Sequence, residues 1–255
     1  MICRLEKPQA AASLFAGWNE TLIWSCLENV MGSIYADSDE NPVSAMAVLG
    51  DFSFFAGIPD EELVMHKPEG ENQELMIMVP QNKIWSELIE KCYPQKAKKV
   101  IRYAFRKKMR IFDQAYLQNR INALSDEYCI KMIDEDLFYR CKDTLWCRDW
   151  VSQYTNYEMY QNYGLGAVIL KDNEIVSGAS SYSSYLEGIE IQIDTKDTYR
   201  RKGLAFVCGA KLILECLKRD LEPSWDAQNK ESAELAGKLG YQFDYKYEAY
   251  EIWRR

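Results

Sequence analysis

The sequence predicts a mixed α/β (α+β) fold in two domains, residues 1–123 and residues 124–255. Three observations predict it. Strand-like and helix-like hydrophobic periods alternate along the chain, the clearest β-hairpin lies in the second half, and a basic turn there joins a strand to a long apolar-periodic helix. With 255 residues, 47% of them apolar, the chain has enough material for one large core or two ordinary ones.

The first half carries helix and strand signals but no recognisable motif. The expected elements are a helix over 14–31, a hairpin over 44–56, a strand over 75–79, a helix over 81–92 and a strand or hairpin over 99–112. We assign no site residue to this half. Three roles fit it equally: a degenerate copy of the second half's fold, a lid that shapes a binding pocket of the second half, or a homodimer surface.

The second half has a more regular order. The expected elements are a strand over 127–133, a helix over 134–141, a helix or loop over 150–163, a hairpin over 166–182, a strand over 189–194, a helix over 204–218, a short strand over 224–227, a helix over 229–240 and one or two strands over 243–252. Tyrosines in the 150–163 segment recur at helical spacing, which favours core packing over a ligand platform.

Composition excludes several classes of partner. The net charge of −8 disfavours nucleic acid and anionic membranes, because those surfaces repel an acidic chain. The basic stretch 96–110 is better explained as a solvated strand edge than as a binding patch. No apolar run approaches the roughly 18 residues of a membrane helix, and we expect a cytoplasmic protein.

Cysteine and histidine usage limits the chemistry further. The eight cysteines include no Cys-x-x-Cys pair, so we expect neither a zinc site nor a disulfide framework. His66 is the single histidine and has no nucleophile motif beside it, which disfavours a catalytic triad and a histidine-rich metal site. Acid–base chemistry is left to carboxylates, tyrosines or water.

A basic turn, Tyr199–Ala205 (Tyr-Arg-Arg-Lys-Gly-Leu-Ala), is the most informative feature of the chain. It follows the strand over 189–194 and opens the helix over 204–218. Backbone N–H groups, the positive end of the helix dipole and three cations converge there, which is typical of a phosphate or pyrophosphate site. An ordinary solvated helix start is the poorer explanation, because helix N-termini favour acids.

The order of elements and this turn resemble the GNAT superfamily of N-acetyltransferases over residues 124–253. Arg200-Arg201-Lys202-Gly203-Leu204-Ala205 fits the family pattern Gln/Arg-x-x-Gly-x-Gly/Ala at every specified position. Leu239-Gly240-Tyr241 is similar to the Leu-Gly-aromatic that closes the next helix in the family. The segment 225–229 further resembles a bacterial subgroup that includes the zwittermicin self-resistance acetyltransferase.

The resemblance implies acetyl-CoA as donor, a small-molecule primary amine as acceptor, and neither metal, nucleic acid nor membrane as partner. It also implies the donor-binding residues. Backbone groups of Ile193, Asp194 and Thr195 would hold the pantetheine arm. The expected pyrophosphate and arm contacts are Arg200, Arg201, Lys202, Gly203, Leu204, Ala205 and Asn229. Asn229 serves equally well as a helix N-cap, and the two roles are compatible.

The strand before the turn supplies a candidate general base. Glu190, Gln192 and Asp194 fall on one face, opposite three isoleucines, whereas a central strand covered by helices on both sides would be almost wholly apolar. An alkylammonium of pKa ~10 must lose its proton before it attacks a thioester, at a cost on the order of 4 kcal/mol at neutral pH. We assign that step to Glu190, with Glu187 in reserve, and oxyanion stabilisation to a backbone N–H near Ile193.

One departure from the family weakens the acid assignment. Many members carry a tyrosine where this chain has Ala236, and that tyrosine protonates the leaving thiolate. Tyr241 is our first substitute and Tyr182 the second, with solvent as the remaining option. The sequence therefore predicts a GNAT acetyltransferase; the alternative is an acyl-CoA-binding or sensing module whose first half binds a partner.

Overall fold

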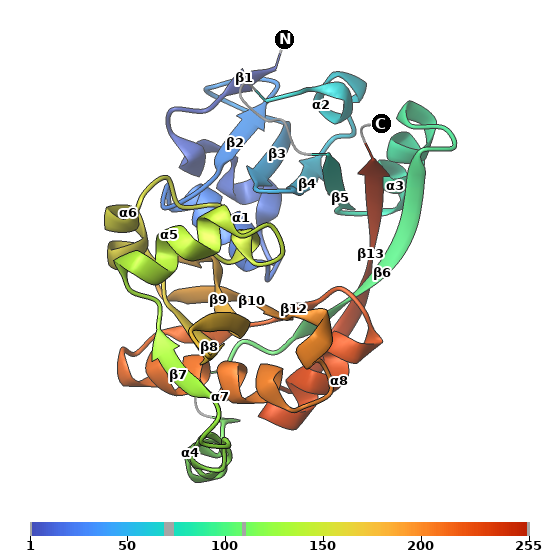
Figure 1. The fold of residues 1–255 in the computed structure, drawn as a ribbon. Coiled ribbons are helices and arrows are strands. Elements are labelled where there is room, and N and C mark those ends of the chain that lie inside the picture. The colour runs from blue at the N-terminus through green and yellow to red at the C-terminus, as the bar shows by residue number, and fades with distance from the viewer. Residues whose placement is uncertain (1, 69–73, 109–110, 254–255) are drawn as a thin grey trace. The chain divides into compact units, whose positions relative to one another are not determined.

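The structure, a computed structural model, describes residues 2–68, 74–108 and 111–253. It divides into two compact units: residues 1–102 with 246–255, and residues 103–245 (Figure 1). The predicted boundary between residues 123 and 124 falls inside the second unit. The observed division differs because the last strand returns to pair with the first unit, so compactness does not follow chain order.

The first unit is built on a sheet with strand order β1-β2-β3-β4-β5-β13-β6. Its strands are β1 (Cys3–Arg4), β2 (Ser33–Ala36), β3 (Ser44–Leu49), β4 (Phe52–Gly57), β5 (Leu75–Pro80), β6 (Ala97–Phe105) and β13 (Phe243–Trp253), and its helices are η1 (Pro8–Phe15), α1 (Thr21–Leu27), α2 (Glu61–Met65) and α3 (Lys83–Cys92). β6 and β13 each continue into the second unit. No helix among the described residues is long and apolar enough to span a membrane.

Predictions for the first unit succeed where the signal is local. The β3–β4 hairpin is confirmed, with Gly50 at φ 57° in its turn, and so are β5 and α3. The predicted helix over 14–31 is wrong in its extent: Gly17 at φ 77° lies between η1 and α1. The strand predicted over 99–112 ends at Phe105, and Met109 and Arg110 lie outside the described residues.

The second unit contains a five-stranded sheet in the order β11-β10-β9-β8-β7. The strands of this sheet are β7 (Cys129–Met132), β8 (Gly166–Lys171), β9 (Glu174–Tyr185), β10 (Gly188–Thr195) and β11 (Glu222–Ser224). The unit also contains β12 (Asp226–Ala227), which pairs with β6. Its helices are α4 (Gln114–Asn122), α5 (Glu135–Asp143), η3 (Arg148–Trp150), α6 (Tyr157–Tyr163), η4 (Asp197–Tyr199), α7 (Leu204–Lys218) and α8 (Lys230–Leu239). The predicted hairpin over 166–182, the predicted strand over 189–194 and the bounds of α7 are confirmed. The sequence did not predict α4.

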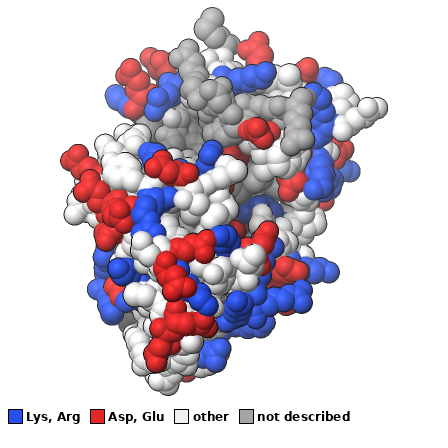
Figure 2. Space-filling model, viewed as in Figure 1, with Lys and Arg blue, Asp and Glu red and all other residues white. Residues whose placement is uncertain are grey.

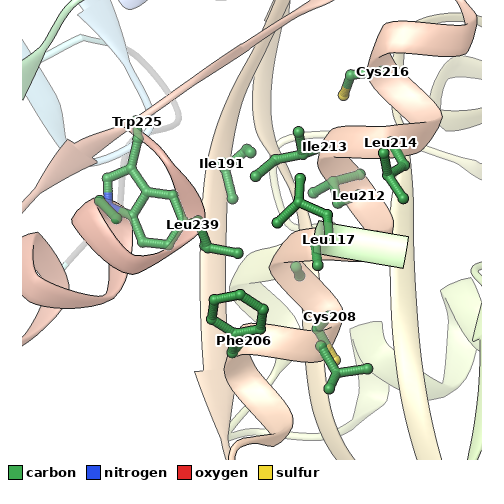
Figure 3. Close-up of a cluster of buried hydrophobic side chains, with 14 of the residues drawn as sticks. Leu117, Ile191, Phe206, Cys208, Leu212, Ile213, Leu214, Cys216, Trp225 and Leu239 are labelled. Carbon is green, nitrogen blue, oxygen red and sulfur yellow. The ribbon is translucent and has the colours of Figure 1, made fainter. Parts of the chain in front are cut away.

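The core of the second unit lies between α7 and one face of its sheet (Figure 3). Ile191 on β10 points toward Ile213 on α7, and Leu239 of α8 packs in the same cluster. Gly209 allows this approach, since a Cβ there would lie 2.8 Å from Leu239 Cδ1 and 3.0 Å from Ile193 Cδ1. Burial of each such aliphatic side chain contributes about 1.5–3 kcal/mol, so β10 is held firmly on its apolar face.

The tyrosine-rich segment before β8 packs against β9, and its Tyr154 and Tyr160 are buried, as expected. Tyr154 is fully buried, and its hydroxyl forms hydrogen bonds with the Ser181 and Ser184 hydroxyls at 2.7 and 2.8 Å. The Tyr160 hydroxyl lies 2.8 Å from Ser180 Oγ. Each buried phenol therefore has its polar partner on β9.

Two lysines of β6 form ion pairs within the first unit. Lys98 pairs with Glu251 at 2.9 Å, and Lys99 pairs with both Glu90 and Glu248 at 3.3 Å. Figure 2 shows Lys and Arg interspersed with Asp and Glu on the visible face. This part of the stretch is a strand, as predicted, and its lysines form ion pairs that the sequence did not predict.

Candidate functional site

The strands β10 and β11 form a fork in the second unit. They pair in parallel at Gly188–Glu222, Ile189–Pro223 and Glu190–Ser224, and the pairing ends there. Trp225 separates β11 from β12, and β12 pairs with β6 instead of β10, with Asp226 opposite Ala104. Among the described residues β10 has no further strand partner on that side, so one of its edges is open beyond Glu190.

Burial along β10 follows the fork. Gly188 to Ile191 are buried, whereas Gln192 to Thr195 are only half-buried. The Lys196 N–H donates to Val176 O at 3.0 Å on the β9 side. Because bonded residues alternate along an antiparallel pair, Ile193 and Thr195 direct their backbone groups to the open edge. These are two of the three positions where the sequence placed the pantetheine contacts, and the backbone groups of the third, Asp194, point to β9 instead.

Glu190 lies at the fork itself. Its side chain is 6% exposed and shares the face of β10 opposite α7, because the neighbouring isoleucines pack in the α7 cluster. On the same face, Asp194 Oδ2 accepts hydrogen bonds from Gln192 Nε2 at 2.9 Å and from Trp150 Nε1 at 3.2 Å. Burial raises the pKa of Asp194, and these two donors oppose the rise.

A second carboxyl group lies beside Glu190. Glu222 stands two residues before Ser224 on β11 and is 8% exposed, and the Tyr185 hydroxyl donates to its Oε2 at 2.7 Å. Burial raises the pKa of Glu222 to about 7; the hydrogen bond from Tyr185 opposes the rise, and the nearby charge of Glu190 adds to it. Two buried acids on one face create a region that favours a positively charged group.

The basic turn has an unusual backbone. Arg201 and Gly203 adopt φ 61° and φ 80°, and Gly203 occupies the N-cap position of α7 without a side-chain cap. The first helical N–H to bond within the helix is that of Val207, to Gly203 O at 3.3 Å. The N–H groups before it are left without helical acceptors. A Cβ at Gly203 would meet nothing within 4 Å, so the approach to these groups is open.

The cations of the turn have modest interactions of their own. Arg200 pairs with Asp197 at 3.0 Å, and its Nε lies 3.4 Å from Thr195 O. Lys202 Nζ stands 4.8 Å above the ring of Tyr199. All three basic side chains are exposed at the start of α7, where they can reach an anion.

Asn229 and Tyr241 each have hydrogen-bond partners of their own. Asn229 is the N-cap of α8, and its side chain accepts the Ser232 N–H at 2.9 Å. Tyr241 packs among Trp225, Phe105 and Phe112, and its hydroxyl donates to Pro223 O at 2.7 Å. Burial raises the pKa of Tyr241 well above its ordinary range. Sequence reasoning did not single out Ser224, Glu222 or Tyr185, because only the strand register brings them beside Glu190.

Comparison with known proteins identifies relatives over almost the full length. A family model described as GNAT acetyltransferase matches residues 12–250. A GCN5-related N-acetyltransferase-like protein from Streptococcus suis 89/1591 is 45% identical, with 98% of this chain and 99% of that chain covered and a TM-score of 0.90. The Bacillus subtilis (strain 168) protein called uncharacterized N-acetyltransferase YdfB is 25% identical over 248 residues, 90% of this chain and 89% of its own.

A more distant structure shows the fold alone. A GCN5-related N-acetyltransferase from Kribbella flavida is 12% identical with a TM-score of 0.55, covering 98% of this chain and 95% of that one. The family match runs through both units, so the resemblance that the sequence placed on residues 124–253 extends well into the first half. The zwittermicin subgroup stays a prediction. The chain belongs to the GNAT acetyltransferase family and is an N-acetyltransferase of that family.

Proposed function

We propose that this protein transfers the acetyl group of acetyl-CoA to a primary amine of a small molecule. The observation that carries the proposal is the fork between β10 and β11. It combines a buried carboxyl group, an open strand edge and an uncapped helix start in one strand–turn–helix segment. These are the three features that a thioester donor with a pyrophosphate and an amine acceptor require.

The donor side of the proposal uses the open edge and the basic turn. Backbone groups of Ile193 and Thr195 suit the amides of the pantetheine arm, with Asp194 between them in the strand. The turn 200–205 suits the pyrophosphate, because the first-turn N–H groups and the helix dipole favour anions. Positive φ at Gly203 and the space around it support this fit. Acetyl-CoA supplies an acetyl group activated as a thioester.

The acceptor side uses Glu190 as general base. The acceptor ammonium gives one proton to the Glu190 carboxylate, directly or through water, and keeps a lone pair for attack on the thioester carbon. The C–N bond forms, the C–S bond breaks, and the sulfur leaves as a thiolate. The attacking nitrogen then gives its second proton to that thiolate or to solvent, which leaves the neutral amide and coenzyme A. Burial of Glu190 supports this role, since a desolvated carboxylate interacts strongly with an ammonium.

The last step of the mechanism is protonation of the thiolate. Tyr241 stays the prediction, but its hydroxyl donates to Pro223 O and its pKa is raised, both of which oppose proton transfer. Ala236 is fully buried in α8. A thiol of ordinary pKa ~8.5 leaves as thiolate without assistance, so the mechanism does not depend on a protein acid.

Release of free coenzyme A in the presence of a panel of primary amines tests the function. We expect turnover by the native protein, and a fall of about 10²–10⁴-fold in kcat/KM for Glu190→Gln with the affinity for acetyl-CoA unchanged. Glu187→Gln decides between the two candidate bases. Glu234→Gln, on the exposed face of α8, is the matched surface control.

The alternative, an acyl-CoA-binding or sensing module, gives a different result. Such a protein binds acetyl-CoA in calorimetry but releases no coenzyme A with any amine of the panel. Full turnover by Glu190→Gln with an unchanged pH–rate profile would refute the assignment of the base while leaving the acetyltransferase function intact.

A further inference from the structure

Ser224 is a buried residue whose hydroxyl has no hydrogen-bond partner within the part of the chain that the structure describes. Its side chain is 1% exposed, and its Oγ is inaccessible to solvent. A buried hydroxyl without a partner loses its hydrogen bonds to water and gains none in return. Such groups are rare in folded proteins, and each calls for a bound ligand or another explanation.

Ser224 lies on the same face of the sheet as Glu190. Ser224 is the last residue of β11 before the fork and lies directly opposite Glu190 in the parallel register. The next residue, Trp225, points toward α8, where its Nε1 donates to Ser232 Oγ at 3.2 Å. Side chains alternate along a strand, so Ser224 shares the face of Glu190 and not the face that packs on α7 and α8.

Other serines of the same sheet give the comparison. Ser181 on β9 is equally buried, and its Oγ accepts hydrogen bonds from the Tyr154 hydroxyl at 2.7 Å and from the Leu165 N–H at 3.0 Å. Ser177 Oγ lies 2.7 Å from Thr195 Oγ1. These two hydroxyl groups stabilise the fold through hydrogen bonds to other side chains or the backbone. The Ser224 hydroxyl forms no such bond within the described residues.

We propose that Ser224 is an acceptor-binding residue, whose hydroxyl accepts an N–H of the substrate's amino group and holds its nitrogen against Glu190. Ser224 thus shares the acceptor with two carboxyl groups, those of Glu190 and Glu222, and the site takes a protonated amino group. After one proton passes to Glu190, the amine still has an N–H for Ser224 and a lone pair for attack. The inference rests on the proposed function, because it assigns the fork to the acceptor.

Ser224→Ala tests this with the amine that gives the highest turnover in the panel. Loss of one hydrogen bond to the substrate raises KM for that amine about tenfold. We expect the affinity for acetyl-CoA and the melting temperature to stay at or above native values, because no bond within the protein is lost. Ser224→Thr keeps the hydroxyl and restores KM at least in part.

Ser181→Ala is the matched control. It removes a buried hydroxyl that has two partners, so it lowers the melting temperature by a few degrees and leaves KM for the amine unchanged. A lower melting temperature for Ser224→Ala with native KM would overturn the proposal, since it would show a structural hydroxyl.

The two proposals fail in distinguishable ways. Native KM for Ser224→Ala overturns the acceptor-binding role and leaves Glu190 as the base. Full turnover by Glu190→Gln overturns the base, while the amine's dissociation constant, measured by calorimetry on both Ser224 variants, still tests the binding role. If no amine of the panel binds the native protein, both proposals are wrong.

Discussion

Two strand–turn–helix connections leave the fork, and they begin their helices in opposite ways. β12 leads to α8, whose N-cap Asn229 accepts the Ser232 N–H at 2.9 Å. β10 leads to α7, whose N-cap is Gly203 at φ 80° with no side-chain cap. Aspartate or asparagine caps likewise begin α2, α3, α4, α5 and α6. α1 also begins without a side-chain cap, at Glu20. The difference between α7 and α8 leaves the first N–H groups of α7 available to an anion.

The two helix starts also differ in the charge of the residues beside them. The residues before α7 are Arg200, Arg201 and Lys202, whereas α8 has Glu231 in its first turn. An acid in the first turn stabilises a helix, and cations there oppose its dipole. The start of α7 is therefore a poorer helix start and a better anion site. The predictions below change one of the two connections at a time.

Conversion of the α7 start to an α8-type start gives the largest expected effect. Gly203→Asp provides a capping carboxylate and places a negative charge at the proposed pyrophosphate site. Two unit charges about 4 Å apart interact by about 4 kcal/mol at an effective dielectric constant of 20, so acetyl-CoA affinity falls about a thousandfold. Isothermal titration calorimetry measures the loss.

Gly203→Asn is the control for that substitution. Asparagine caps equally well, tolerates positive φ and adds no charge. The difference in affinity between Gly203→Asp and Gly203→Asn isolates the charge. Equal acetyl-CoA binding by both variants and the native protein would contradict a pyrophosphate site at this turn.

The next largest effect is expected at Glu222 on β11, the strand that precedes β12 and α8 in the chain. Burial raises the pKa of Glu222 to about 7, above the ordinary 4.5. A carboxyl group with a raised folded-state pKa ionises first in the unfolded chain, so stability falls as pH rises from about 4.5 toward 7. Glu222→Gln removes this loss and keeps an acceptor for the Tyr185 hydroxyl. At pH 8 we expect a gain of about 3 kcal/mol.

Urea unfolding at pH 5 and pH 8 checks this prediction. The difference between Glu222→Gln and the native protein should grow with pH, whereas the exposed control Glu234→Gln should show no such trend. A Glu222→Gln protein less stable than native at pH 8 would mean that the ionised carboxylate stabilises the fold.

The smallest effect is expected at Asn229, where substitutions distinguish the helix-cap role from the predicted contact with the pantetheine arm. Asn229→Ala removes the cap of α8 and costs about 1 kcal/mol in the free energy of unfolding. Asn229→Asp keeps the cap but replaces the amide N–H with a carboxylate. If Asn229 also binds the pantetheine arm through its amide, Asn229→Asp unfolds like the native protein but binds acetyl-CoA more weakly. Unchanged affinity would restrict Asn229 to its capping role.

Local signals in the sequence predicted local structure well. The β3–β4 and β8–β9 hairpins, α7 and the capped start of α8 each depend on a few consecutive residues. The failures have physical causes. Gly17 ends a helix that hydrophobic spacing alone extended to Met31, and the basic run that suggested a long strand gives way to α4 after Asp113 caps its start.

The candidate site was predicted in part for the same reason. Alternation along β10 is readable in the sequence, so the choice of Glu190 followed from it. The basic turn was visible from its own residues, and the family resemblance supplied Ile193 and Thr195. Glu222 and Ser224 lie far from Glu190 in the chain, and a shift of one residue in strand register would turn their side chains to the other face. Tyr241 was chosen by sequence position, and packing directs its hydroxyl to Pro223 O instead.

The sequence by itself determined the family, the basic turn before α7 and the polar face of β10, because each is carried by residues close together in the chain. Only the tertiary structure decided where β10 loses its partner, which serine stands opposite Glu190 and which acid has a pKa near neutrality. Those properties arise from strand pairing and desolvation between distant segments, and neither is encoded in any local pattern.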